Sequence, residues 1–222
     1  MSVRQLALDL PLAPSYAQAD FVVGEANRLA FDLVERWPDW PHPALVLHGP
    51  EGAGKTHLVH LWLARTGGAR IEAATLAGAD LAALAARPLA VEDVDQRVEE
   101  TALLHLFNRA MESRPGLVLT GRRAAAAWPV RLPDLRSRLV ALPTVAVAPP
   151  DDVLLRAVLA KLFADRQLKV DERVLAYLPT RMERSFAAAH GLVAAIDQAA
   201  LAAHREVSLA LVGEVLRGRT EE

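Results

Sequence analysis

The chain contains no cysteine, and only three of its 25 basic residues are lysines: Lys55, Lys161 and Lys169. Without cysteine there is no disulfide framework, no thiolate zinc site and no cysteine nucleophile. The sequence also lacks an uninterrupted apolar run near the roughly 18 residues that a transmembrane helix needs. Its first 20 residues do not have the pattern of a signal peptide. We therefore expect a cytoplasmic protein without a membrane partner.

The 25 basic residues nearly balance the 27 acidic ones, which gives a formal net charge of -2 at pH 7. Proteins that hold DNA by its phosphates usually carry a basic excess. We therefore expect no direct sequence-specific DNA binding. Hydrophobic residues make up 52% of the 222 residues, which excludes wholesale disorder and suffices for a folded core.

Short apolar runs alternate with helical patterns until about residue 149. Strands are predicted over 44–48, 70–72, 89–91, 117–120 and 141–145, and helices over 28–37, 55–65, 75–86 and 98–112. This alternation predicts an α/β fold, with a parallel sheet flanked by helices. After Pro150 only helical periodicity remains. The predicted domains are an N-terminal arm (1–20), a nucleotide-binding core (21–149) and a small all-α lid (150–222).

One motif carries specific chemistry. Residues 49–56, GPEGAGKT, match G-x-x-x-x-G-K-[ST] between an apolar strand and a helix. In such a P-loop, backbone N–H groups at the helix N-terminus cradle phosphate oxygens, the lysine reaches the β- and γ-phosphates, and the threonine hydroxyl holds Mg²⁺. The predicted nucleotide-binding residues of this loop are Gly49, Pro50, Gly52, Ala53, Gly54, Lys55, Thr56 and His57.

Two acidic residues follow the strand predicted at 89–91. A P-loop requires an acid at the end of a neighbouring strand, and Glu92 and Asp93 are both candidates as catalytic residues. One would hold Mg²⁺ and the other would orient the attacking water. We assign the metal to Thr56 and Glu92. The alternative is an ordinary acidic loop, because Asp95 and further acids follow.

Seven arginines between residues 109 and 138 are opposed by only two acids, Glu112 and Asp134. One of them could reach a phosphate, including one in a neighbouring molecule. An arginine finger supplied in trans accelerates phosphoryl transfer by roughly 10³–10⁵. The alternative is a solvated, charged surface.

The order and spacing of these motifs resemble the DnaA-type AAA+ ATPases from about residue 5 to the C-terminus. Residues 21–30, FVVGEANRLA, look like the box with which that family cups adenine. The resemblance implies ADP or ATP with Mg²⁺ as cofactors, and nucleotide contacts from Val22, Val23 and Asn27. Residues 118–120 fit the family's sensor 1 strand.

Two later boxes also fit that family. Residues 132–139 look like its arginine-finger box, which implies that Arg138 is the finger. Residues 182–186 resemble its sensor 2 helix, which implies that Arg184 contacts nucleotide. Two positions depart from the pattern: Glu92 stands where Asp is usual, and Arg122 stands at the sensor 1 position, where Asp or Asn is usual. Both departures predict nucleotide binding with weak or no ATP hydrolysis by this protein itself.

The N-terminal arm carries the hexapeptide QLALDL at residues 5–10. In extended form Gln5 could hydrogen-bond in a groove while Leu6, Leu8 and Leu10 fill an apolar pocket. The hexapeptide is similar to the motif by which proteins bind the DNA polymerase III sliding clamp. The alternative is an edge strand or a disordered arm, since alternating leucines are common.

Together, the clamp motif and the AAA+ boxes resemble the Hda (HdaA) regulators of the DnaA family. The resemblance implies that the protein binds the clamp, docks on ATP-bound DnaA and stimulates hydrolysis of its ATP through Arg138, which prevents over-initiation. The predicted partners are the clamp, DnaA and a second copy in a homodimer. Because 222 residues leave no room for an initiator's DNA-binding domain, we expect a regulator. The alternatives are a self-hydrolysing ATPase such as a DnaC-like helicase loader, and an adaptor that only tethers to the clamp.

Overall fold

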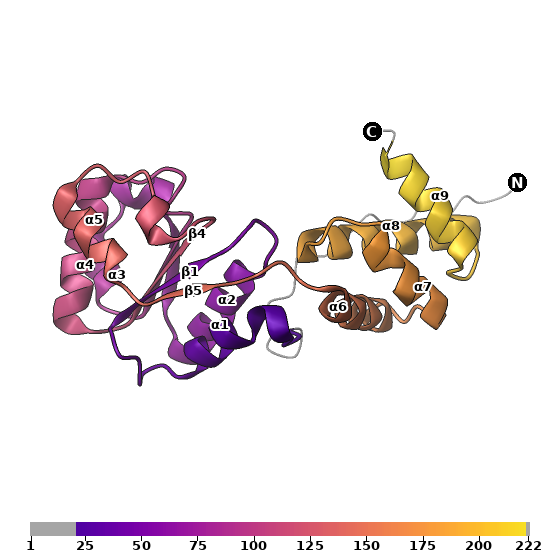
Figure 1. The fold of residues 1–222 in the computed structure, drawn as a ribbon, viewed down its shortest axis with the longest axis horizontal. Coiled ribbons are helices and arrows are strands. Elements are labelled where there is room, and N and C mark those ends of the chain that lie inside the picture. Colours follow the sequence, from indigo (N-terminus) through magenta and orange to yellow (C-terminus); the bar gives the residue numbers. More distant parts are fainter. Residues whose placement is uncertain (1–20, 221–222) are drawn as a thin grey trace, which may run out of the picture. The chain divides into compact units, whose positions relative to one another are not determined.

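The computed structural model describes residues 21–220, and its internal contacts divide the chain between Asp151 and Asp152 into two units. The predicted clamp motif at residues 5–10 lies outside the described residues. The N-terminal unit contains α1 (Glu25–Glu35), β1 (Ala44–His48), α2 (Lys55–Thr66), β2 (Ala69–Glu72), η2 (Ala73–Gly78), α3 (Leu81–Ala85), β3 (Leu89–Glu92), α4 (Glu100–Ser113), β4 (Leu117–Gly121), η3 (Ala125–Ala127), α5 (Pro133–Val140) and β5 (Thr144–Ala146). The C-terminal unit contains α6 (Asp152–Asp165), α7 (Glu172–Tyr177), η4 (Leu178–Thr180), α8 (Phe186–Ala203) and α9 (Leu209–Thr220) (Figure 1).

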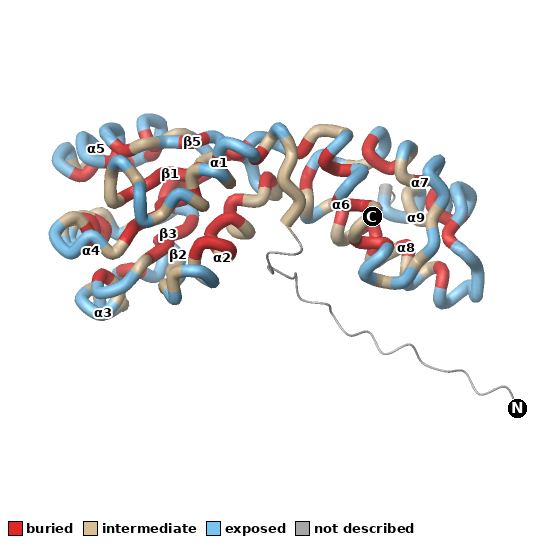
Figure 2. Tube along the Cα trace, turned by 90° about the horizontal axis from the view of Figure 1, so that it is seen from below, coloured by how far each residue is buried: buried red, intermediate tan, exposed pale blue. Residues whose placement is uncertain are grey.

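The five strands of the N-terminal unit form one parallel sheet in the order β2-β3-β4-β1-β5. One face packs on α1 and α2, and the other packs on α3, α4 and α5. Because both faces are covered, the central strands are continuous apolar runs rather than alternating ones. Figure 2 shows β1 and β3 buried between the helical layers. The predicted α/β fold with a helical lid is confirmed.

A cluster of three tryptophans packs on the face of the sheet that α1 and α2 cover. The fully buried Trp62 stacks on Trp40 at 5.5 Å between ring centroids and meets Trp37 edge-on at 6.2 Å. The Trp40 indole donates to the carbonyl of Leu33 at 2.7 Å. A Cβ on Gly116 would lie 2.5 Å from the Trp37 Nε1, so glycine allows β4 to begin directly under these rings.

Two predicted elements differ from the structure. The single helix predicted over 75–86 is wrong, since η2 ends at Gly78 and α3 begins only at Leu81. Asp80 has an extended backbone, and its carboxylate accepts from the amides of Ala82 and Ala83 at 3.0 and 3.1 Å. This side-chain cap starts a new helix instead of continuing the old one.

The last strand lies further along the chain than predicted. Residues 141–145 were expected to form it, but Ala141 ends α5 and donates its amide to carbonyls of that helix. Leu142 also donates to Leu139. The strand therefore begins at Thr144, where pairing with β1 becomes available.

The described part of the C-terminal unit contains helices and no strand, as the helical periodicity after Pro150 predicts. Within residues 21–220, α8 is the one helix long and apolar enough to cross a membrane by length and composition. Its buried residues Ala189, Leu192, Val193, Ile196 and Ala200 contribute to the core of this unit, which is ordinary for the core helix of a bundle.

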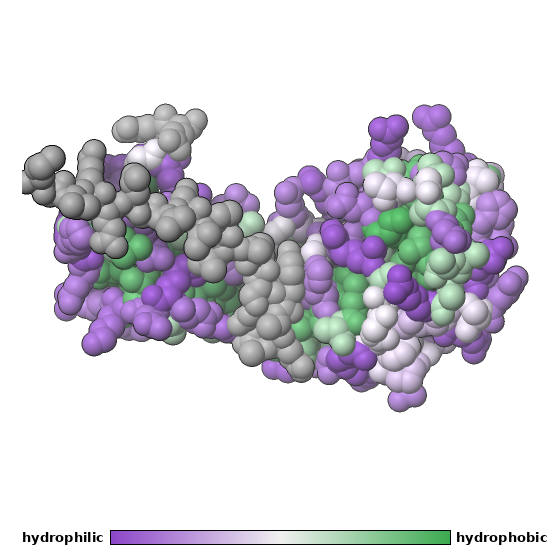
Figure 3. Space-filling model, turned by 180° about the vertical axis from the view of Figure 1, so that it is seen from behind, coloured by the Kyte–Doolittle hydropathy of each residue, from purple (hydrophilic) through white to green (hydrophobic). Residues whose placement is uncertain are grey.

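Large exposed hydrophobic residues are scattered along the chain. On the face drawn in Figure 3, hydrophilic residues form most of the outer edge of the N-terminal unit. The exposed large hydrophobic residues are Leu29, Val140, Val153, Leu201 and Leu209. Single exposed apolar side chains of this kind are usual on soluble domains.

Replacing Trp62 by alanine should strongly destabilise the N-terminal unit. The substitution removes a fully buried indole and leaves a cavity, at a cost of about 3–5 kcal/mol in the free energy of unfolding. Denaturant unfolding followed by circular dichroism would measure the cost. Leu29→Ala, at a residue with 71% exposure on the nearby α1, should cost far less. Equal effects of the two substitutions would contradict the assignment of Trp62 to the core.

Candidate nucleotide-binding site

The predicted site residues of the core converge at the carboxyl ends of three adjacent strands. β4 lies between β3 and β1. The loop after β1 leads into α2, β3 ends at Glu92, and β4 ends at Gly121. Parallel sheets bind ligands at this edge because the strand-to-helix loops meet there.

The loop before α2 has the backbone that an anion site requires. Gly52 and Gly54 have φ values of 72° and 98°, which glycine adopts without strain. A Cβ on Gly49 would lie 2.1 Å from the carbonyl oxygen of Val147. No side chain caps α2 at Gly54. Because the first amides of an α-helix have no intrahelical partner, this helix start suits an anion.

The Lys55 ammonium lies inside this loop. Its Nζ donates to the carbonyls of Gly49 at 2.7 Å and Pro50 at 2.9 Å, and only 8% of the residue is exposed. Burial lowers the pKa of Lys55, and the nearby carboxylates of Asp93 and Asp95 partly offset this. A desolvated ammonium held by neutral carbonyls favours an anionic ligand, so the loop fits a phosphate group.

The two predicted metal ligands lie together. The Thr56 hydroxyl donates to Glu92 Oε1 at 2.7 Å, although they are 36 residues apart. A hydroxyl and a carboxylate are suitable oxygen ligands for Mg²⁺, which normally takes its remaining ligands from water and substrate phosphates. Within residues 21–220 no group of three acids, histidines or cysteines could hold a metal ion alone. The donor set therefore fits Mg²⁺ only when a nucleotide contributes ligands.

Glu92 has a second partner that the sequence did not indicate. Its Oε2 accepts from Arg70 Nε, which reaches it from the edge strand β2. Glu92 is 2% exposed. A carboxylate this deeply buried requires a counter-ion or hydrogen-bond donors, and Arg70 and Thr56 supply them.

Asp93 adopts a left-handed backbone conformation, with φ of 57°. β4 holds it there: the Thr120 hydroxyl accepts from the Asp93 amide at 3.1 Å, and the Thr120 carbonyl accepts from the Val94 amide at 2.9 Å. Partial desolvation raises the pKa of the Asp93 carboxyl, as does the adjacent Glu92, against an opposing effect of Lys55.

Arg122 lies beside the P-loop, where the family resemblance puts sensor 1. The buried Asp95 accepts from the amides of Arg122 and Arg123 at 2.9 and 3.2 Å. The Arg122 guanidinium pairs with Glu51 of the loop at 2.7 Å. The end of β4 is thereby tied to the acidic loop after β3 and to the P-loop.

The segment before α1 packs against the start of α2. The Asn27 side chain donates from Nδ2 to the Val22 carbonyl at 3.0 Å, and its Oδ1 accepts from the Gly24 amide at 2.9 Å. Because Asn27 is buried and occupied in this way, it fixes the segment that carries Val22 and Val23. Phe21 meets the His57 ring edge-on at 5.0 Å, which joins this segment to the P-loop helix.

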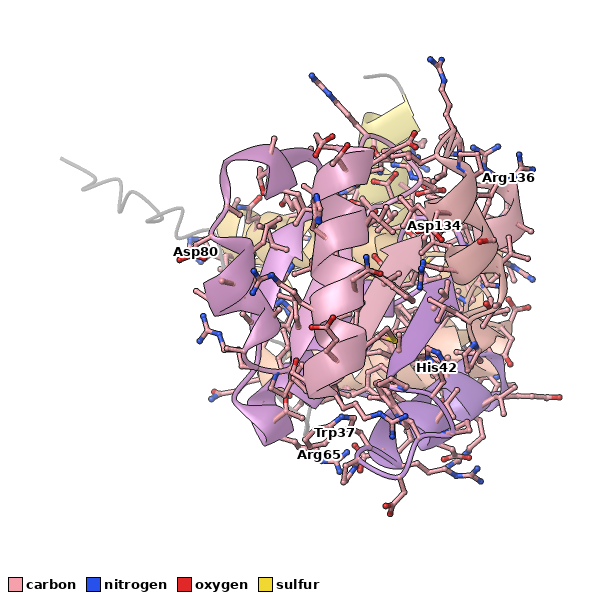
Figure 4. The ribbon with its side chains drawn as sticks, turned by 90° about the vertical axis from the view of Figure 1, so that its left-hand side faces the viewer. Trp37, His42, Arg65, Asp80, Asp134 and Arg136 are labelled. Carbon is pink, nitrogen blue, oxygen red and sulfur yellow. The ribbon has the colours of Figure 1, made fainter. Side chains whose placement is uncertain are left out.

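Arg138 lies outside this cluster, on the exposed side of α5. Its Nε donates to Asp134 Oδ1 at 2.9 Å, one helical turn earlier. Figure 4 looks onto this side of the core, with Asp134 and Arg136 labelled on α5. Glu100 of α4 accepts from the amides of Arg131 and Leu132 and so fixes the start of α5.

The helix expected around Arg184 begins later than predicted. Ser185 is the N-cap of α8, and its hydroxyl accepts from the Ala188 amide at 3.1 Å. Arg184 therefore precedes the helix instead of lying on it. Within the C-terminal unit its guanidinium pairs with Asp152 at 2.9 Å.

Comparisons with known proteins agree with this geometry. A family model described as the bacterial DnaA ATPase domain matches residues 12–68, and one described as the lid domain of Hda matches residues 152–216. The chain is a DnaA-related AAA+ protein.

Full-length relatives extend well beyond this chain. The replication initiator DnaA of Lactobacillus delbrueckii subsp. bulgaricus is 24% identical over 251 residues, which cover 96% of this chain and 53% of that protein. DnaA of Lactobacillus helveticus is also 24% identical, with the same coverage of each chain. The chain thus spans about half the length of the curated relatives it matches.

Solved structures share the fold of this DnaA-related protein. Domain III of Thermotoga maritima DnaA superposes with a TM-score of 0.78 at 20% identity, over 94% of this chain and 98% of that one. AMPPCP-bound DnaA from Aquifex aeolicus has a TM-score of 0.71 at 20% identity, over 83% and 66% of the two chains. A Thermotoga maritima RuvB mutant has a TM-score of 0.67 at 16% identity, over 86% and 67%. At these identities the likeness shows the AAA+ fold.

Sequence reasoning missed three residues of this DnaA-related site. Arg70 is 22 positions from Glu92, and no local pattern indicates that they meet. In the sequence, Asp95 is one of several acids in a loop and Thr120 is the end of a strand. Each acts through contacts between neighbouring strands, which become visible only when the strand order is known.

Asp93→Asn should stabilise the protein at neutral pH. The raised pKa of Asp93 means that the fold disfavours the ionised form, so stability falls as the pH rises from the unfolded pKa through the folded one. Asparagine removes this ionisation and tolerates the left-handed backbone. We expect a higher melting temperature than wild type at pH 7–8 and convergence of the two below pH 4, measured by thermal unfolding. Asp32→Asn, at an exposed acid of α1, is the control. A less stable variant at pH 7 would refute the electrostatic argument.

Proposed function

We propose that this protein binds ADP or ATP at its P-loop and, in that form, stimulates hydrolysis of DnaA-bound ATP through Arg138 acting in trans. In the proposal the N-terminal arm binds the DNA polymerase III sliding clamp, and the outcome is regulatory inactivation of DnaA, which prevents over-initiation. The observation that carries the proposal is an assembled P-loop in a chain whose C-terminal region matches the Hda lid.

Nucleotide binding is supported by the desolvated Lys55 ammonium and the uncapped start of α2. Both favour phosphate at the same place. A bound nucleotide would supply the phosphate oxygens that Mg²⁺ needs in addition to Thr56 and Glu92. The AMPPCP-bound DnaA of Aquifex aeolicus has the same fold, which is consistent with a nucleotide site here.

Action in trans is supported by the exposure of Arg138. An exposed ion pair one helical turn apart contributes only about 0.3–0.5 kcal/mol, so exchanging Asp134 for a phosphate of a partner's nucleotide would cost little. Guanidinium keeps its charge at all physiological pH values and can hold phosphate in two-point geometry. The Glu100 carboxylate anchors the start of α5 and would keep the finger in a fixed place.

The features around Glu92 and at the end of β4 favour a regulator over a self-hydrolysing helicase loader. Glu92 is already paired with Arg70, and Arg122 stands at the sensor 1 position beside the P-loop. Both reduce the acidic character on which metal-assisted hydrolysis depends. The proposed regulator works in the cytoplasm, requires no membrane and no sequence-specific DNA contact, and can form a homodimer.

Arg138→Ala should abolish the stimulation of DnaA. We would mix this protein, clamp loaded on DNA, and ATP-bound DnaA, and follow ADP formation on DnaA. Removing the finger should lower the stimulated rate at least about tenfold, since such arginines contribute roughly 10³–10⁵. Arg136→Ala, two residues earlier on the same helix, is the matched control and should retain stimulation. If wild type gives no acceleration, the regulatory proposal fails; if Arg138→Ala retains it, only the finger assignment fails.

Removal of residues 1–10 should abolish binding to the clamp and leave ADP binding unchanged. A finer test replaces Gln5, Leu6 and Leu8 by alanine, because the proposed contact needs both the glutamine amide and the apolar side chains. Co-elution with purified clamp in size-exclusion chromatography measures the result. Unchanged co-elution of either variant would exclude residues 5–10 as the clamp motif.

A further inference from the structure

The Glu92 carboxylate has both oxygens occupied by protein groups. Oε1 accepts from the Thr56 hydroxyl, and Oε2 pairs with the Arg70 guanidinium. The carboxylate is almost fully buried, with 3% of the side chain exposed, whereas 38% of the Arg70 side chain is exposed. The pair thus joins a desolvated anion to a cation that keeps part of its hydration.

The register of the sheet explains how Arg70 reaches Glu92. β2 and β3 are parallel, with Arg70 opposite Ala90 and Glu72 opposite Glu92. Residues two apart on a strand share a face, so Arg70 lies diagonally across from Glu92 on the same face of the sheet, and its long side chain reaches the carboxylate. Ala90 belongs to the core on the α2 side, and this is also the side from which Thr56 approaches.

This arrangement changes what a metal ion would meet. Mg²⁺ is attracted to such sites by uncompensated carboxylate charge and by phosphate oxygens. Here arginine, which stays protonated in proteins, already compensates the charge of Glu92. A metal ion would have to displace the Arg70 guanidinium from the buried Glu92 carboxylate to gain the full charge of that ligand.

The P-loop also has cations of its own. Lys55 lies within the loop, and Arg122 pairs with Glu51 of the loop. Arg122 and Glu51 are 50% and 78% exposed in their side chains, so their pairing is weak and the guanidinium is available for an anion. The protein thereby supplies positive charge that other phosphate sites obtain from a metal.

We propose that Arg70 is a built-in counter-ion for Glu92 and makes nucleoside diphosphate binding at this P-loop largely independent of Mg²⁺. The proposal rests on the nucleotide binding included in the proposed function. Arg70 acts through its contact with Glu92 and is therefore a positioning residue.

The test measures the affinity of the full chain for a fluorescent ADP analogue, by anisotropy, in Mg²⁺ and in EDTA. For wild type we expect the dissociation constant to change by less than about threefold between the two conditions, because Glu92 contributes little free charge. Arg70→Gln should restore a preference for Mg²⁺ of about tenfold or more, because it frees the charge of Glu92. Arg65→Gln removes another surface-reaching arginine, paired with Glu35, and should behave as wild type.

Several outcomes would overturn the proposal. A wild-type affinity that falls tenfold or more in EDTA refutes it without any variant, so it stays testable even if Arg70→Gln fails to fold. An Arg70→Gln variant that folds, by circular dichroism, and shows the wild-type insensitivity to EDTA also refutes it. If wild type binds no ADP analogue in either condition, and Lys55→Ala behaves identically, the nucleotide site of the proposed function fails as well. If wild type binds the ADP analogue only with Mg²⁺ but stimulates DnaA normally, this inference is refuted and the proposed function stands.

Discussion

The burial of one carboxylate organises the candidate site. Glu92 ends β3 with almost no exposure, and an unpaired charge there would oppose folding. Thr56 approaches from the first turn of α2, and Arg70 approaches from the edge strand, so one acid joins the P-loop helix to two strands. The residue that would hold a metal is therefore also a structural anchor of the sheet edge.

β4 supplies the second set of constraints, because it lies between the strand of the acids and the strand of the P-loop. The Thr120 hydroxyl accepts from the Asp93 amide and its carbonyl accepts from the Val94 amide. These two hydrogen bonds hold Asp93 in a left-handed conformation. Just beyond the strand, Asp95 fixes the amides of Arg122 and Arg123. Asp93 combines a left-handed backbone with partial desolvation, at a position where a binding site typically uses stability that the rest of the fold provides.

The protein separates its arginines by role. Arg70 is used inside the site as a counter-ion, and Arg122 lies beside the P-loop. Arg138 is held on the outside by a weak pair on a helix whose start is anchored by Glu100. In the proposed function, the cations Lys55, Arg70 and Arg122 retain phosphate at this site, and hydrolysis by the protein itself is weak or absent. The exposure of Arg138 is consistent with the proposed action on another molecule's nucleotide.

The sequence by itself determined the parts that depend on neighbouring residues. The glycine-rich loop with Lys55 and Thr56, the alternation of strands and helices, and the change to all-helical periodicity after Pro150 are local patterns, and all of them appear in the structure. Errors arose where a single side chain outweighed helix propensity, as at Asp80 in the predicted helix over 75–86 and at Ser185 ahead of α8.

Only the tertiary structure decided which distant groups meet. Strand order and register place Arg70 diagonally across from Glu92 and put Thr120 beside Asp93, and these depend on the packing of the whole sheet. Arg70 and Glu92 are 22 residues apart, and no sequence periodicity indicates that they pair. The pair is stabilised by burial, which exists only in the assembled fold.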